Sequence, residues 1–118
     1  MYKSPNEYRA FLKEMLFDFR ELEEYQSQIP KEIPEDLSLA YFGNLLTLVI
    51  NDYKNKESKS LLKIITHIAA IPKKKYPSSV LADFTAELLE KINDKIGLDN
   101  AEVNSYMSEE MKKTILTV

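Results

Sequence analysis

The sequence predicts an all-α fold, a compact bundle of four to five helices. Through most of the 118 residues, apolar side chains recur at steps of three and four, the spacing of a buried helix face. Only two glycines occur, and the five prolines lie between the apolar runs. A many-stranded sheet would need a turn signal every ~8–12 residues. We therefore expect one helical domain over residues 1–118.

The most apolar stretch, residues 37–50, predicts the central helix of the bundle. It contains no charged residue, and apolar side chains would cover nearly every side of the helix, as in a buried one. It is too short for a bilayer, which needs about 20 residues, so we assign it to a core. Gly43, in its interior, predicts close packing against a neighbouring helix, although glycine costs ~1 kcal/mol there relative to alanine.

The remaining helices follow from apolar stripes and from their start and stop signals. Ser4 and Glu7 form a capping box for the first helix. Ser78 or Ser79 is expected to cap the fourth helix, and Gly97 lies where a left-handed residue ends it. The expected helices span about 5–27, 35–53, 59–71, 79–96 and 100–116, by their apolar period.

Charge is distributed unevenly along the chain, although the net charge is only −3. Acidic residues are in excess by 4 in residues 1–36 and again by 4 in 79–118, whereas basic residues are in excess by 5 in 37–78. The acidic ends disfavour nucleic-acid binding, which depends on clustered Lys and Arg. A nucleic-acid site would need the lysines of the middle segment on one face: Lys54, Lys56, Lys59, Lys63 and Lys73 to Lys75.

No motif in the sequence predicts catalysis or cofactor binding. The chain has no cysteine, which excludes thiolate chemistry and suits a cytoplasmic location. His67 is the only histidine, and its neighbours on a helix include no carboxylate that could orient it. We expect no enzyme activity, no cofactor, no metal site, no small-molecule substrate and no membrane span.

Two acidic stripes are the candidate partner-binding residues. Steps of three and four place each stripe along one side of a helix, and the second stripe lies opposite an apolar face, where solvent is expected. The candidates are Glu14, Asp18, Glu21 and Tyr25 on the first helix, and Asp83, Glu87, Glu90 and Asp94 on the fourth.

These observations predict a small acidic helical protein that inhibits or neutralises a partner protein. The functional type is an immunity protein that blocks a basic bacterial toxin such as a nuclease, with acidic residues steering association and tyrosines as anchors. The alternatives are a structural or scaffolding subunit or homodimer and, third, a nucleic-acid-associated protein.

Overall fold

The structure, a computed structural model, describes residues 5–29, 38–72 and 75–117. It confirms the all-α class, because the described residues form helices joined by short turns, with no strand among them. The helices are α1 (Pro5–Asp18), α2 (Glu23–Gln26), α3 (Ser38–Lys54), α4 (Ser60–Ala69), α5 (Ser78–Lys95), α6 (Ala101–Tyr106) and α7 (Glu109–Thr117), with a 3-10 turn at Arg20–Leu22. Within these residues, no helix has both the length and the apolar character needed to cross a bilayer.

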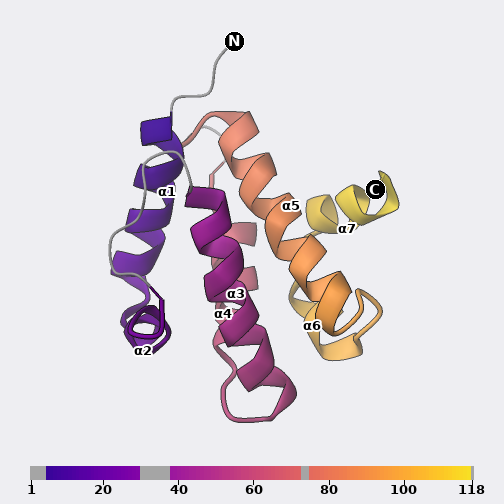
Figure 1. Cartoon of the computed structure of the whole chain (residues 1–118). Helices are drawn as coiled ribbons and strands as arrows, with labels where there is room; N and C mark the ends of the chain where they lie inside the picture. Colours follow the sequence, from indigo (N-terminus) through magenta and orange to yellow (C-terminus); the bar gives the residue numbers. More distant parts are fainter. Residues whose placement is uncertain (1–4, 30–37, 73–74, 118) are drawn as a thin grey trace.

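The central helix is α3, as the apolar stretch predicts. It lies between α1 and α5, with α4 behind it (Figure 1), and it contacts α1, α2, α4 and α5. Five of its apolar side chains have no exposed surface, and they follow the helical period: Phe42, Leu45, Leu46, Val49 and Ile50. Burial of this kind is worth roughly 1.5–3 kcal/mol per side chain, so α3 holds the bundle together.

Stacked aromatic rings join the three helices at the front of the bundle. The Phe84 ring of α5 stacks on Phe11 of α1 with centroids 4.3 Å apart, and it meets Phe42 of α3 edge-on at 5.2 Å. These three rings are among the largest fully buried side chains. Offset and edge-on ring pairs add about 0.5–1.5 kcal/mol beyond the area that they bury.

Gly43 provides the close approach that its position predicts. A Cβ at Gly43 would collide with the Glu87 carboxylate of α5 and would press on the Lys91 stem. The absence of a side chain at Gly43 therefore leaves room for the Glu87 and Lys91 side chains of α5.

The first expected helix, 5–27, is wrong in its second half. Helical geometry stops at Phe19, whose φ of −113° and ψ of 84° turn the chain into the 3-10 turn and α2. The bend lets Leu22 and Tyr25 pack in the core, and it brings α2 against α3. Neither glycine nor proline marks this break, so packing against α3, and not local sequence, sets its position.

The last expected helix, 100–116, is also interrupted. Met107 is extended, with ψ of 139°, and Ser108 then starts α7 by accepting a hydrogen bond from the Met111 amide at 3.2 Å. As a result α6 packs against α4 while α7 packs against α5. Ser108 followed by Glu109 and Glu110 is a helix-start signal that the apolar period alone does not reveal.

The predicted helix ends are partly correct. Gly97 has a φ of +96° and its amide donates to the Ile92 carbonyl at 2.9 Å, which confirms the left-handed stop of α5. The Ser78 or Ser79 cap is wrong, because the capping position is Pro77 and no side chain caps α5 there. Ser4 and the expected start of the central helix at residue 35 lie outside the described residues.

Candidate functional site

Two carboxylates of the first acidic stripe pair with side chains of α4 and of the turn before α5. Glu21 pairs with Lys63 of α4 at 2.8 Å. Glu14 accepts hydrogen bonds from the Lys75 ammonium and the Tyr76 hydroxyl. Each of these pairs joins positions more than 40 residues apart, so the two carboxylates connect α1 and the following turn to the second half of the chain.

Hydrogen bonds and burial shift the pKa values of Glu14 and of two aromatic side chains near it. The hydrogen bonds from Lys75 and then Tyr76 hold the pKa of Glu14 below its usual range. Burial, followed by the Glu14 hydrogen bond, raises the pKa of Tyr76. His67 packs edge-on against Phe19 at 4.9 Å, and its burial lowers the imidazole pKa although Asp18 and Glu14 oppose that shift.

The last two members of the first set differ in exposure. Asp18 is exposed, and its charge acts on His67 of α4. Tyr25 is only 5% exposed, so its ring packs in the core and offers little area to a partner. Burial raises the pKa of Tyr25, and Asp52 adds to that effect.

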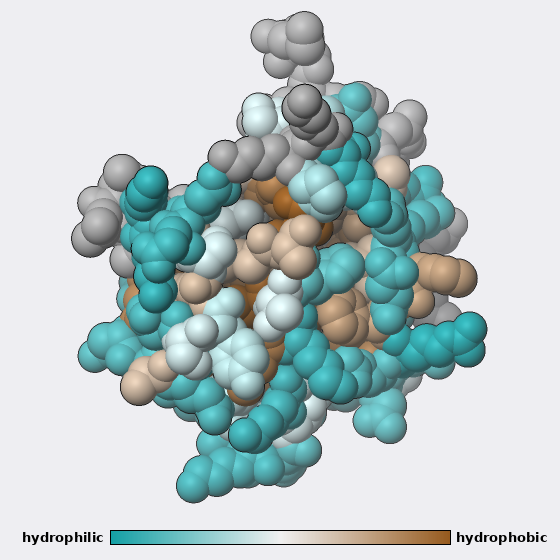
Figure 2. All heavy atoms as spheres, turned by 180° about the vertical axis from the view of Figure 1, so that it is seen from behind, coloured by the Kyte–Doolittle hydropathy of each residue, from teal (hydrophilic) through white to brown (hydrophobic). Residues whose placement is uncertain are grey.

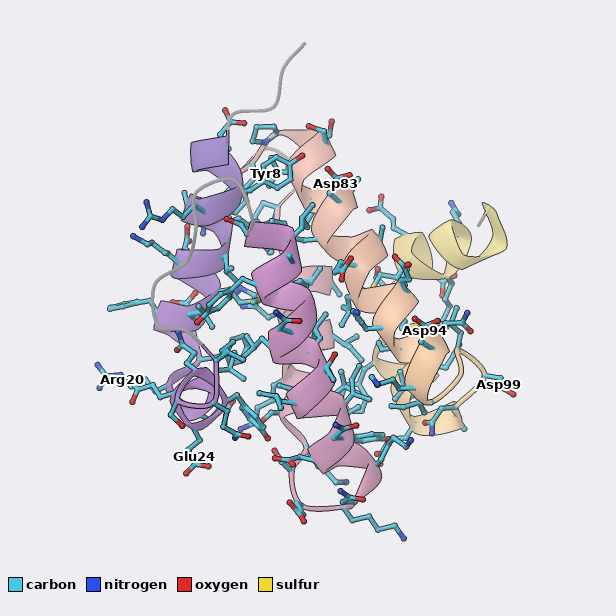
Figure 3. The ribbon with its side chains drawn as sticks, in the orientation of Figure 1. Tyr8, Arg20, Glu24, Asp83, Asp94 and Asp99 are labelled. Carbon is cyan, nitrogen blue, oxygen red and sulfur yellow. The ribbon has the colours of Figure 1, made fainter. Side chains whose placement is uncertain are left out.

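The second acidic stripe is divided between the protein interior and its surface. Figure 3 shows Tyr8 beside Asp83 at one end of α5, where the Tyr8 hydroxyl donates to Asp83 at 2.6 Å. Glu87 is half-buried over Gly43, and this burial raises its pKa although Lys91 opposes the shift. The expectation of a wholly solvated face is therefore wrong for Asp83 and Glu87. Glu90 and Asp94 are exposed as expected.

A further group of acidic side chains, which includes Glu21 of the first stripe, surrounds a hollow between α2 and the turn that joins α3 to α4. The hollow has a volume of about 520 Å³. Of the described residues that line it, five are acidic and one, Arg20, is basic. Tyr25, Ser58 and Ser60 add hydroxyl groups. We call it the acidic hollow; its carboxylates belong to Glu21, Glu23, Glu24, Asp52 and Glu57.

The acidic hollow brings together segments that the sequence separates. Arg20 and Glu24 project from the α1–α2 corner (Figure 3), whereas Asp52 and Glu57 come from the end of α3 and the turn after it. Sequence reasoning identified Glu21 and Tyr25 but missed Asp52 and Glu57, which lie in the basic middle segment. No local signal marks them, because they meet α2 only through tertiary packing.

The described lysines of the middle segment form two groups, three around one hollow and two paired with carboxylates of the first acidic stripe. Lys54, Lys56 and Lys59 border a second hollow, of about 680 Å³, near α6. Lys59 pairs there with Glu102 at 3.5 Å, and Glu102 also accepts from the Tyr53 hydroxyl at 2.5 Å. Lys75 is paired with Glu14 of α1 and Lys63 with Glu21 of the 3-10 turn that follows, and Lys73 and Lys74 lie outside the described residues.

Apolar residues reach the surface at the rear of the molecule. Figure 2 shows apolar residues in the middle of this face, partly covered by hydrophilic side chains. An apolar hollow of about 340 Å³ lies where the end of α4 meets α5 and α7, with Ile71, Leu81 and Met111 among its walls. The large apolar side chains that stand exposed in the described part of the chain are Phe17, 76% exposed, and Tyr106, 47% exposed.

Among the described residues, no three or more His, Asp or Glu side chains are grouped as metal ligands would be. Comparison of the chain with known protein families, with curated proteins and with solved structures finds no match. The function must therefore be inferred from the geometry and charge of the surface.

Proposed function

We propose that this protein binds and neutralises a partner protein that carries a basic surface, in the manner of an immunity protein that blocks a bacterial toxin such as a nuclease. The acidic hollow is the observation that carries the proposal. Glu21 is paired with Lys63, and the other four carboxylates outnumber the one guanidinium and attract cations. The concave wall lets a Lys or Arg side chain of the partner enter between them.

The hydrogen bonds that the two acidic stripes make within the chain favour the acidic hollow over the stripes as the docking site. Glu14 and Asp83 already accept hydrogen bonds from side chains of this chain, so a partner would have to displace them. Glu23 and Glu24 are exposed and line the acidic hollow. Steering by such exposed charges raises the association rate, and salt screens it over a Debye length of about 8–10 Å.

The test compares two double variants that alter the net charge equally. Glu23→Lys with Glu24→Lys reverses two charges in the acidic hollow, and Glu90→Lys with Asp94→Lys reverses two exposed charges on α5. The partner is first captured from the native host, or supplied as the product of a neighbouring gene, and its association rate is then measured at several salt concentrations.

We expect the hollow variant to slow association by about 10-fold or more at low salt and the α5 variant to have a much smaller effect. Equal effects would show that net charge alone matters. Loss of binding in the α5 variant alone would move the docking site to Glu90 and Asp94. A stable homodimer in solution that binds no other protein would favour the structural alternative.

A further inference from the structure

Phe17 is the most exposed large apolar side chain in the described part of the protein. The inner face of α1 is filled by Phe11, Leu12, Met15 and Leu16, each at most 9% exposed, whereas Phe17 is 76% exposed on the outer face. The core therefore gains little from the Phe17 ring. Phenylalanine is also a weaker helix former than the charged residues usual at such a position, so neither packing nor helix propensity accounts for it.

The position of Phe17 links it to the acidic hollow. Arg20, on the wall of the hollow, follows three residues later, and three residues of chain span at most about 11 Å. Asp18, exposed, is the next residue after Phe17. The backbone of Phe17 therefore lies within about 11 Å of the Arg20 backbone, on one wall of the acidic hollow.

We propose that Phe17 is the apolar anchor of the docking surface around the acidic hollow, and that it fits a partner protein whose apolar recess is bordered by Lys or Arg. This inference rests on the proposed function. Charge complementarity selects the occupant: the excess of carboxylates in the hollow repels an acidic surface and attracts a basic one. Interfaces of this kind depend on a few large anchors that lose contact with water, surrounded by polar contacts that are worth less.

The experiment uses three capped tripeptides as probes and follows the Phe17 ring and the backbone of residues 20–24 by NMR. The peptides are Arg-Leu-Arg, Arg-Gly-Arg and Glu-Leu-Glu. We expect Arg-Leu-Arg to shift both sets of signals, Arg-Gly-Arg to shift residues 20–24 with weaker affinity, and Glu-Leu-Glu to shift neither. Phe17→Ala should weaken Arg-Leu-Arg binding about three- to tenfold and leave Arg-Gly-Arg binding unchanged.

Two further variants serve as controls. Tyr106→Ala removes the other exposed large apolar side chain and should not alter peptide binding. Phe17→Leu keeps an apolar side chain and should retain part of the Arg-Leu-Arg affinity. Because Phe17 is so exposed, neither of its variants should change the unfolding temperature appreciably.

The outcomes separate this inference from the proposed function. Equal affinities for Arg-Leu-Arg and Arg-Gly-Arg, or no effect of Phe17→Ala, would overturn the anchor role while the charged hollow remained. No response of residues 20–24 to either arginine peptide would count against the hollow as a cation site. Phe17 signals that shift with protein concentration alone would identify a contact between two copies of the chain and would also overturn the inference.

Discussion

Lys56 has a backbone conformation that glycine adopts more easily, and replacing it by glycine should stabilise the fold. Its φ is +61°. The Glu57 amide donates to the Asp52 carbonyl at 2.9 Å, and the Lys56 amide donates to the Tyr53 carbonyl at 3.1 Å. Those two bonds are the Schellman pattern, which places Lys56 at the left-handed position after α3, where glycine is the usual residue.

The magnitude follows from two opposing terms. A left-handed backbone costs an L-residue roughly 1–2 kcal/mol, because its Cβ crowds the following carbonyl oxygen. Glycine removes this cost, but its greater freedom in the unfolded chain destabilises the folded state by about 0.5–1 kcal/mol. The free energy of unfolding should therefore rise by about 0.5–1 kcal/mol, and the unfolding temperature by on the order of 2–5 °C.

Chemical and thermal unfolding followed by circular dichroism measure this change. Lys56→Ala is the matched control, because it also removes the lysine charge and stem but keeps the Cβ, so it should show no gain. Lys54→Gly, on the last helical turn of α3, should instead cost about 0.5–1 kcal/mol. If Lys56→Gly proved no more stable than Lys56→Ala, the strain assigned to the left-handed backbone would be wrong.

Three other changes test the core and the charged contacts. Phe84→Ala removes a fully buried ring between α1 and α3 and should cost about 3–5 kcal/mol in denaturant unfolding; a loss below 1 kcal/mol would contradict the packing described. Burial raises the pKa of Glu87 in the folded protein. Its favourable contribution to the free energy of unfolding therefore exists below the unfolded pKa and is lost as pH rises. Glu87→Gln should become increasingly stabilising, relative to the natural protein, as pH rises above the ordinary pKa of 4.5. Hydrogen bonds lower the pKa of Glu14 in the folded protein. Its contribution to the free energy of unfolding therefore exists above the unfolded pKa and is lost as pH falls. Glu14→Gln should destabilise the protein at neutral pH and do so progressively less in acid. As pH rises, the free energy of unfolding relative to the natural protein should thus increase for Glu87→Gln and decrease for Glu14→Gln.

The helical class and most helix faces could be predicted because they depend on local features. Apolar residues at steps of three and four fix which side of each helix is buried, whatever it packs against. Gly97 ends α5 for a reason that belongs to its own backbone, and Asn100 begins α6 by accepting from the Val103 amide. Ser108 carries the same kind of local information. If Ser108 is taken as a helix N-cap, it predicts that the last expected helix is divided at this residue.

The function of the charged residues could not be predicted in this way. The period that predicts Glu14 and Glu21 on one side of a single helix says nothing about which helix will face them. The structure brings Lys63 and Lys75 to these two carboxylates, so each is paired within the chain while it stays at the surface. Asp83 and Glu87 likewise lie against α1 and α3.

By itself, the sequence determined that this chain is helical, that the apolar stretch within α3 forms its centre, and that α5 ends at Gly97. Only the tertiary structure decided which carboxylates remain exposed, why the chain bends at Phe19, and that Asp52 and Glu57 share a hollow with Glu23 and Glu24. Helix formation and burial are decided within a few turns, whereas a charge has no partner until distant helices have packed together.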